Sequence, residues 1–373
     1  MSCSLSIELL PEFGWSINHQ PVYGPGSVFQ GFVKLNTKST ALSVQRVRLA
    51  FYAIETIPPY NISSTVLRTA RKTLFSTQRI LWDSGDQHPL DRDTDYSFPF
   101  TIQMPMIQFP PSFHHPAYQC LFQLIAVADT PLSLENKTMP IRTEIPVICM
   151  PFIETSLLKT PLQFKSHKGH LSAQLKLTAA EFVPSSPIQI QLHVACQQKK
   201  KKSSLQYVSV QLKLIQNLRF LVLNDIPDQT KTVAHVTQKL PLISHEHEDS
   251  LSLYSDADLT LPIPASATPS CAYSEFVQIS YVLQVSIEQK GPMGGIWNHS
   301  VVFEDIPVVI GTLGYGIRTS SEIKMYSDFN PNAPSTMPVP KFMKAIEYED
   351  ALPVYDPCRL PNYDHSVTQN ACF

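Results

Sequence analysis

A repeated pattern of leucine, proline and tyrosine near the C-terminal end is the part of this sequence best suited to a specific contact. Leu-Pro-x-Tyr-Asp occurs at residues 352–356 and again at 360–364. Proline fixes φ and favours a polyproline-like extended backbone, so little chain entropy remains to be lost on binding. The aromatic-lined groove of a WW-type domain accepts such a segment. The predicted contact residues are Leu352, Pro353, Tyr355, Leu360, Pro361 and Tyr363.

Chance is the alternative explanation, because the chain is rich in proline. With 32 prolines and 14 tyrosines in 373 residues, about one Pro-x-Tyr triplet is expected at random. The chain contains five, but only the two near its C-terminal end have leucine before the proline and aspartate after the tyrosine. Only these two follow the last strand-like segment. We therefore interpret the pair as a docking element.

Four consecutive lysines form the sharpest charge feature of the sequence. They fall where a hairpin turn is expected to join the strands predicted at 188–195 and 205–214. Like charges repel and need water, which favours a solvated loop tip. The functional alternative is contact with anionic lipid headgroups, worth on the order of 1 kcal/mol per basic residue. Both interpretations stay open for the candidate lipid-binding residues Lys199, Lys200, Lys201 and Lys202.

Patterns for catalysis or metal binding are weak. His245-Glu246-His247-Glu248 has ligand chemistry, but it lacks the i, i+4 histidine pair of a helical zinc site and is expected in a polar loop. His114-His115 precedes Pro116 in a predicted turn, with no cysteine or carboxylate at ligand spacing. The glycines of residues 291–295 are explained as a hairpin loop rather than a phosphate cradle. The sequence therefore predicts no enzyme, no metal site and no cofactor.

Composition narrows the class of protein further. A hydrophobic content of 43% and a charged content of 16% are typical of a β-rich globular chain. The net charge of −2 gives no global electrostatic argument for nucleic acid. Seven cysteines without a Cys-x-x-Cys pair predict a reduced, intracellular protein. No run of about 18 apolar residues occurs, so no signal peptide or membrane span is expected.

The elements that must position these features are predicted to be strands. Residues 44–54 alternate clearly, with Val47, Leu49, Phe51 and Ala53 on one face, and Pro58-Pro59 is expected to be a turn. No segment of twelve or more residues keeps a helical apolar period. Besides 188–195 and 205–214, strands are expected at 5–9, 28–35, 73–82, 96–104, 117–129, 141–148, 169–177, 233–240, 251–261, 275–287 and 301–310.

Many short strands separated by proline and glycine turns indicate β-sandwiches. The predicted fold class is all-β, with two tandem immunoglobulin-like sandwiches at residues 1–155 and 156–318. Alternation stops from Gly314 onward, and residues 330–340 are rich in proline, asparagine and serine. Residues 319–373 are therefore expected to be a largely disordered, flexible tail that carries the two motifs.

Several segments, taken in order over roughly residues 4–312, resemble the arrestin family and its α-arrestin branch. In the first half, residues 98–105 and 110–113 are similar to the family's Phe-x-Phe and Pro-Pro-Ser-Phe element. In the second half, residues 261–264 and 279–287 resemble the corresponding element, and residues 306–312 resemble the closing strand. The order and spacing of these pieces together carry the resemblance.

The resemblance implies a non-enzymatic scaffold of two sandwiches. In α-arrestins the sandwiches recognise membrane cargo, and Pro-Pro-x-Tyr or Leu-Pro-x-Tyr motifs recruit the WW domains of HECT-type ubiquitin ligases. The implied function is an adaptor that promotes ubiquitination, endocytosis and sorting of a transporter or receptor. The implied location is the cytoplasm, with recruitment to the plasma membrane or endosomes. Lys341 and Lys344, just before the motifs, become candidate ubiquitin acceptors, although exposed lysines are usually only solubilising.

One departure from the family pattern affects the expected strength of docking. Leucine stands in the first proline position in both copies, which should weaken each contact because one preformed polyproline residue is lost. A second copy partly compensates by raising the local concentration for rebinding. The alternative function is a structural subunit of an endosomal coat or sorting complex with the same fold. Such a subunit has no need of paired motifs.

Overall fold

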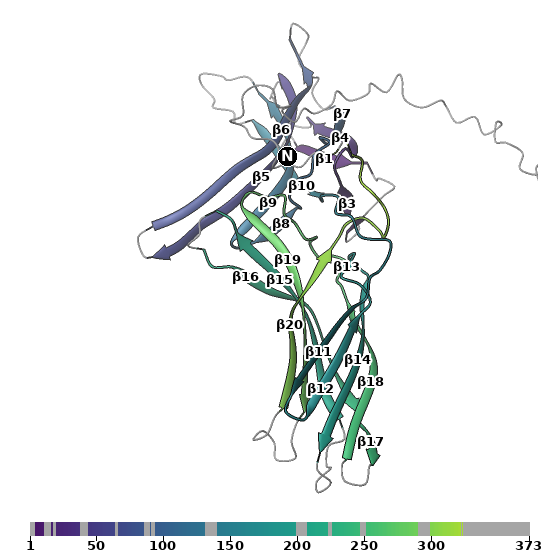
Figure 1. The fold of residues 1–373 in the computed structure, drawn as a ribbon. Helices are drawn as coiled ribbons and strands as arrows, with labels where there is room; N and C mark the ends of the chain where they lie inside the picture. Colours follow the sequence, from purple (N-terminus) through teal and green to yellow (C-terminus); the bar gives the residue numbers. More distant parts are fainter. Residues whose placement is uncertain are drawn as a thin grey trace, which may run out of the picture.

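The structure is a computed structural model that describes residues 4–10, 16–17, 20–37, 44–63, 66–85, 90, 94–130, 140–198, 207–222, 226–246, 251–289, 299–321 and 323. Every regular element in these ranges is a β-strand, and the strands form two lobes of paired sheets (Figure 1). The predicted all-β class with two sandwiches is confirmed. The two Leu-Pro-x-Tyr motifs lie outside the described residues.

The first lobe packs a three-stranded sheet against a larger one. Val47, Leu49, Phe51 and Ala53, predicted to share one face, are all buried between these sheets. The smaller sheet has the order β1 (Ser4–Leu9), β4 (Val28–Asn36) and β7 (Asp95–Gln103). The larger has the order β2 (Ser16–Ile17), β3 (Gln20–Tyr23), β10 (Ile141–Cys149), β9 (Tyr118–Asp129), β5 (Arg46–Ser63) and β6 (Val66–Asp83), and β8 (Phe113–His115) pairs with β9.

The hairpin of β5 and β6 is longer than the sequence predicted, with 18 residues in each strand. Pro58-Pro59, expected to be a turn, lie within β5, where the pairing register with β6 shifts between Ile57 and Tyr60. That prediction is wrong. Pairing of β5 with β9 stops at Thr56, so the prolines occupy an edge and an irregularity, positions that tolerate a residue without an N–H.

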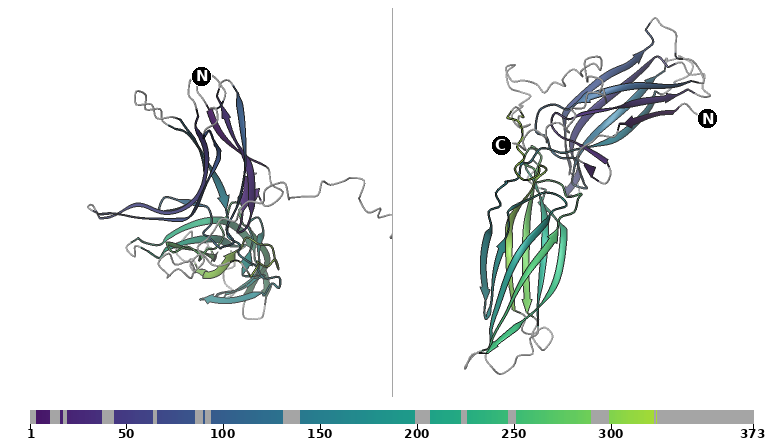
Figure 2. Two further views of the ribbon diagram at one scale, coloured as in Figure 1. Left: turned by 90° about the horizontal axis from the view of Figure 1, so that it is seen from above. Right: turned by 90° about the vertical axis from the view of Figure 1, so that its right-hand side faces the viewer.

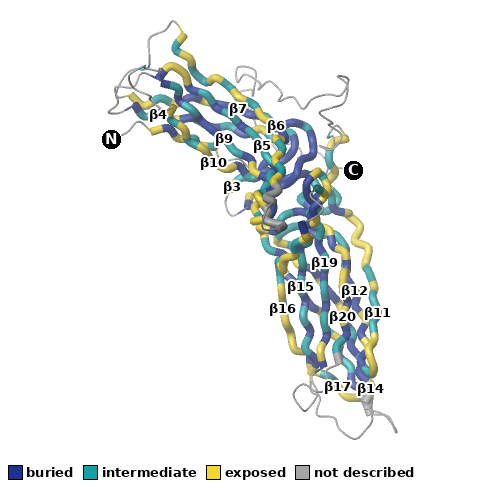
Figure 3. The backbone as a smooth tube through the Cα atoms, turned by 90° about the vertical axis from the view of Figure 1, so that its left-hand side faces the viewer, coloured by how far each residue is buried: buried dark blue, intermediate teal, exposed yellow. Residues whose placement is uncertain are grey.

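The second lobe consists of two five-stranded sheets. In the first, β11 (Leu162–Lys168), which the sequence did not predict, precedes β12 (Leu171–Leu177), β14 (Pro187–Gln198), β18 (Leu251–Pro262) and β17 (Ile243–Glu246). The second has the order β13 (Glu181–Phe182), β20 (His299–Ile310), β19 (Val277–Gln289), β15 (Tyr207–Phe220) and β16 (Gln229–Pro241). Buried and more exposed residues alternate along these strands in both lobes, which lie end to end at an angle (Figures 2 and 3).

The expected hairpin around the lysine run is wrong. β14 pairs with β12 and β18, whereas β15 pairs with β16 and β19, so the connection between β14 and β15 passes from one sheet to the other. Alternation predicts that each strand has a buried face, but both sheets of a sandwich satisfy it equally. Lys199, Lys200, Lys201 and Lys202 themselves lie outside the described residues.

His245 and the pair His114-His115 also lie in strands where the sequence suggested loops. His245 and Glu246 belong to β17, where they pair with Ser252 and Leu251 of β18. His114 and His115 belong to β8, a short strand that turns directly into β9. Strands as short as β8 and β17 have little sequence signal of their own, because the longer strands beside them provide most of their stability. No helix capable of crossing a membrane occurs among the described residues.

The segment after β20 returns to the link between the lobes. Thr312 Oγ1 accepts a hydrogen bond from Ile153 N at 2.8 Å and donates one to the Pro151 carbonyl at 2.7 Å. Thr155 Oγ1 donates to the carbonyl of Leu313 at 2.9 Å. Glu154 accepts from the backbone and hydroxyl of Thr319, and these bonds hold the pKa of its carboxyl below the usual value, with further help from Arg318. The end of the second lobe is thereby fastened to the linker.

Candidate functional site

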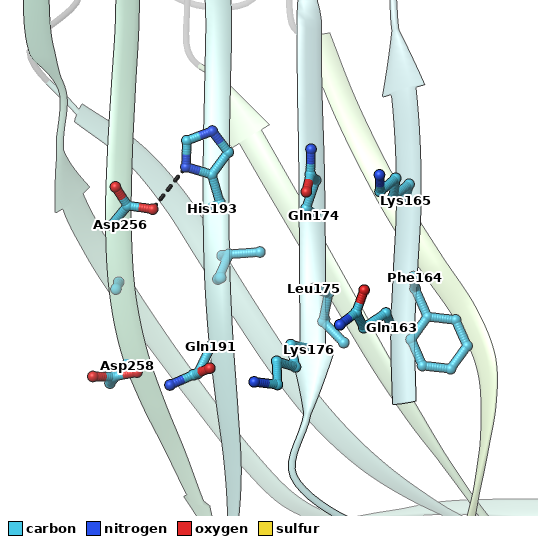
Figure 4. Close-up of a pocket in the computed structure, with 12 residues that line it drawn as sticks. Gln163, Phe164, Lys165, Gln174, Leu175, Lys176, Gln191, His193, Asp256 and Asp258 are labelled. Carbon is cyan, nitrogen blue, oxygen red and sulfur yellow. Dashed lines mark hydrogen bonds and ion pairs between the residues drawn. The ribbon is translucent and has the colours of Figure 1, made fainter. Parts of the chain in front are cut away.

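A shallow pocket of about 410 Å³ lies on the outer face of the sheet that contains β11, β12, β14 and β18 (Figure 4). The inward side of these strands is apolar, so the residues between the buried ones face solvent and are free to be polar. The lining side chains with polar groups are Gln163, Lys165, Gln174, Lys176, Gln191, His193, Asp256 and Asp258.

Strand register arranges these side chains in two rows across the sheet. In one row Lys165 pairs with Gln174, Gln174 with His193, and His193 with Asp256. The second row contains, in the same strand order, Gln163, Lys176, Gln191 and Asp258. Directly opposed residues of antiparallel strands point to the same face, so each row forms a continuous polar band.

Charge changes sign along both rows, from lysines on β11 and β12 to aspartates on β18. Nδ1 of His193 lies 2.7 Å from Oδ1 of Asp256, and the two side chains point toward each other in Figure 4. The residues that line this pocket include no serine, threonine or cysteine, so the His–Asp pair has no nucleophile to activate. The arrangement offers hydrogen-bond donors and acceptors for a polar partner surface.

A second polar centre is buried where the lobes meet. Glu55 on β5 is 0% exposed. Its Oε1 accepts hydrogen bonds from the Tyr118 hydroxyl of the first lobe, at 2.6 Å, and from the Ser274 hydroxyl of the second. The same Ser274 oxygen accepts from the backbone N–H groups of Phe276 and Val277, which shapes the loop before β19. Glu55 therefore holds a loop of the second lobe against the first.

Burial raises the pKa of the Glu55 carboxyl, and the hydrogen bonds from Ser274 and Tyr118 and the charge of Lys72 oppose this rise. Its Oε2 has no hydrogen-bond partner among the described residues. Beside it, Nζ of Lys72 forms an ion pair of 2.6 Å with Oε1 of Glu275, again across the two lobes. A buried carboxyl with one unsatisfied oxygen is costly unless its other contacts are well formed.

The structure describes few of the residues that the sequence singled out. Leu352, Pro353, Tyr355, Leu360, Pro361, Tyr363, Lys341, Lys344 and Lys199–202 all lie outside the described residues. His114 and His115 line a different cavity, between the lobes. No group of three metal-ligating side chains occurs in the part of the chain that the structure describes. Cys120, Cys149 and Cys271 are buried free thiols, and burial raises the pKa of each.

Sequence reasoning missed both the polar rows and the buried carboxyl. Glu55 had a detectable signal, because it continues the inward-facing series Val47, Leu49, Phe51 and Ala53 at the next alternate position. A charged residue at an inward position predicts either a strand end or a paired buried charge. The approach of His193 to Asp256 had no such signal, because it depends on the register between β14 and β18.

Comparison with known families identifies the second lobe. Residues 167–315 match the family model described as arrestin (or S-antigen), C-terminal domain. The second lobe is an arrestin C-terminal domain. The matched range runs from the end of β11 through β20 to the segment that returns to the linker between the lobes. A search of curated proteins found no match. An arrestin domain indicates an adaptor or trafficking role in general terms.

Proposed function

We propose that this protein is an α-arrestin that links an integral membrane cargo protein to a WW-domain HECT-type ubiquitin ligase. Ubiquitination and endocytic sorting of the cargo, a transporter or receptor, follow from that bridge. The protein acts in the cytoplasm and is recruited by its cargo to the plasma membrane or endosomes. The observation that carries the proposal is the pair of Leu-Pro-x-Tyr motifs that follow two complete sandwiches.

The position of the motifs relative to the folded body supports this bridging role. Thr319 is anchored to Glu154 by hydrogen bonds of 2.8 Å, and Leu352 follows it by 33 residues. A chain of that length reaches at most about 110–120 Å when fully extended. The motifs can therefore engage a ligase well away from the surfaces of the sandwiches, which leaves those surfaces accessible to cargo.

The polar pocket of the second lobe is the proposed cargo contact. The amide groups of its glutamines can form hydrogen bonds with a polar or extended segment of the cargo. Its side chains change from positive on β11 and β12 to negative on β18, which favours a cargo segment whose charges run in the opposite order. Charge reversal at Asp256 and Asp258 to lysine is expected to lower cargo recovery without affecting ligase recovery.

A pull-down with isolated WW domains of a HECT-type ligase tests ligase recruitment. Single Tyr355→Ala and Tyr363→Ala variants are expected to retain weakened binding, because one motif remains, whereas the double variant loses it. Tyr348→Ala is the matched control, since Tyr348 lies in the same stretch but outside both motifs. Equal binding by the double variant and the unaltered protein would falsify the mechanism. Absence of binding by the unaltered protein would favour a coat subunit without ligase recruitment.

A further inference from the structure

The strand β11 forms an open edge of the second lobe. It is the outermost strand of its sheet, and within the described residues it pairs with β12 alone. Figure 3 shows β11 at the margin of the lobe. An edge strand presents backbone N–H and C=O groups that have no partner in the sheet, so an extended peptide can pair with it as a further strand.

Interruptions protect most of the other long edge strands from such pairing. The pairing register of β16 shifts once, and that of β6 shifts at four places. β20, which pairs with β13 only at its end, has a register shift, a φ of 57° at Asp305, and Pro307 two residues later. β7 contains Pro99, which has no N–H. By contrast, the seven residues of β11 pair with β12 in unbroken register and include no proline.

Charge distinguishes β11 from β1, whose six residues also pair in unbroken register. The one charged residue of β1, Glu8, forms an ion pair with Lys34 of the neighbouring strand β4. β11 carries Lys165, His167 and Lys168 and no acid. None of these three side chains forms an ion pair within the part of the chain that the structure describes. β11 therefore combines a regular open edge with unneutralised positive charge.

This positive charge extends onto β12, where Lys176 shares the outer face of the sheet with the rows of the polar pocket (Figure 4). β12 and β14 contain no acid, so the first carboxylates on this face are Asp256 and Asp258 on β18. Neighbouring strands lie about 4.8 Å apart, which puts β18 about 14 Å from β11. That exceeds the Debye length of about 8–10 Å at physiological salt, so these aspartates do little to neutralise the edge.

The inner side of β11 offers apolar contacts to an added strand. Leu162 and Phe164 lie opposite Leu177 and Leu175 of β12, which are buried in the core. Leu162 and Phe164 are themselves only half-buried. The Phe164 ring extends beyond β11 on the side away from β12 (Figure 4). Because side chains alternate along a strand, a matching partner has apolar residues on one side and charged residues on the other.

We propose that the cargo contact of the second lobe includes β11, which binds an extended, acidic segment of the cargo as an additional strand of its sheet. Acidic residues at alternate positions of that segment face Lys165 and His167, and the intervening apolar residues pack against Leu162 and Phe164. This role of β11 rests on the proposed cargo function of the adjacent pocket. It gives the cargo segment a defined chemistry: extended, acidic, and apolar at every second position.

A second copy of the chain is a poor partner for this edge. Centred antiparallel pairing of two β11 strands would place Lys165 opposite its own copy and His167 opposite Gln163. Like charges directly opposite each other destabilise a strand pair. The charges that oppose self-association are therefore the ones that select an acidic partner.

Three labelled peptides test the chemistry of this edge, by fluorescence anisotropy with the full chain at low salt. The first, acetyl-Glu-Val-Glu-Val-Glu-Val-Glu-amide, matches the length of β11 and is expected to bind. The second has lysine in place of every glutamate, and the third is the glutamate peptide N-methylated at every internal amide. Both are expected to bind about tenfold or more weakly, because one reverses the charge and the other removes the backbone donors.

Two double variants test the location. Lys165→Glu with Lys168→Glu is expected to weaken binding of the glutamate peptide about tenfold or more and to favour the lysine peptide instead. Lys213→Glu with Lys239→Glu is the matched control, because it makes the same change of charge on β15 and β16, in the other sheet. Thermal melting verifies that each variant is folded.

Hydrogen exchange locates the contact without any substitution. The glutamate peptide is expected to slow exchange in residues 162–168 of the unaltered protein more than in β16 or β6, the other long edges. The proposal is overturned if the glutamate peptide does not bind, if either control peptide binds as well, or if both double variants lose binding equally. Protection confined to another edge also overturns it. None of these outcomes alters the WW-domain pull-down, so a failure here is distinct from a failure of ligase recruitment.

Discussion

At the scale of single residues, Glu55 shows how this chain turns a costly group into a specific contact. A buried carboxyl is unfavourable, but its Oε1 receives one hydroxyl from each lobe, Tyr118 and Ser274. Hydrogen bonds in a low-dielectric interior are strong when formed and costly when broken. The contact therefore tolerates only a narrow range of positions for the loop before β19. Its main contribution is to the geometry of the junction.

The titration of Glu55 makes the junction sensitive to pH. Its folded pKa is raised above the ordinary value of 4.5, so the folded state binds the proton more tightly than the unfolded state. Stability from this group is present below about pH 4.5 and is lost as the pH rises through the folded pKa, with a slope of at most about 1.4 kcal/mol per pH unit. Glu55→Gln keeps an acceptor oxygen but cannot titrate. We expect the urea midpoint of this variant to rise relative to that of the unaltered protein as the pH increases.

Urea unfolding at several pH values from about 5 to about 8 measures this difference. Glu275→Gln serves as the control, since Glu275 lies beside the same junction but is 44% exposed. Parallel curves for Glu55→Gln and the unaltered protein would show that Glu55 does not titrate differently on folding.

At the scale of elements, the segment after β20 is held by close backbone approach. A Cβ added at Gly311 would lie 2.4 Å from Cγ2 of Thr155 and 3.0 Å from the carbonyl oxygen of Ile153. Glycine is needed here because of this contact with the linker, and the contact allows Thr312 and Leu313 to bond with residues 151–155. The same segment carries Arg318, whose Nη1 lies 2.8 Å from Oε2 of Glu154.

Gly311→Ala is therefore expected to displace the returning segment. The cost should be about 1–3 kcal/mol, the usual effect of forcing extra atoms into a packed site. Trypsin should cleave after Arg318 faster than in the unaltered protein, because the loosened segment is more available to a protease. Gly314→Ala is the matched control, since its nearest neighbour would be Cδ1 of Ile317 at 3.4 Å. Equal cleavage of both variants would contradict this account of Gly311.

At the scale of the whole molecule, the two regions proposed for recruitment leave the second lobe at opposite ends. β14 begins at Pro187, opposite Pro262 at the junction end, and it ends at Gln198, just before the lysine run (Figure 1). The chain that leads to the motifs departs from the junction, where Thr319 bonds to Glu154. The proposed adaptor would thus meet a membrane at the end of β14, while the chain that carries the two motifs starts at the junction.

Replacement of Lys199–202 by alanine tests the membrane interpretation of this end. At about 1 kcal/mol per residue near an anionic surface, loss of four lysines should weaken binding to phosphatidylserine vesicles by about three orders of magnitude. Co-sedimentation at low and high salt provides the measurement. A control variant with the same charge change replaces Lys159, Lys165, Lys176 and Lys213. Equal vesicle binding by the two variants would leave the lysine run as a solvated loop.

Much of the fold follows from the sequence alone, because burial leaves a local pattern. Val47, Leu49, Phe51 and Ala53 alternate with more polar neighbours, and each lies in the core as expected. Alternation of this kind depends only on the two-residue period of a strand, so it predicts strands and a sandwich class without knowledge of the partners. The paired Leu-Pro-x-Tyr motifs are likewise a local pattern and stand independently of the packing.

Only the tertiary structure decides which strands are neighbours and which side chains they bring together. The sequence placed β14 and β15 in one hairpin, yet they lie in different sheets, because the same alternation fits either sheet. Asp256 reaches His193 through the register of β18 with β14, and Lys231 reaches the cavity between the lobes because one bulged residue shifts the register of β16. Glu55 meets Ser274, 219 positions later, only when two lobes pack. Such contacts depend on long-range register and domain packing, which no local period encodes.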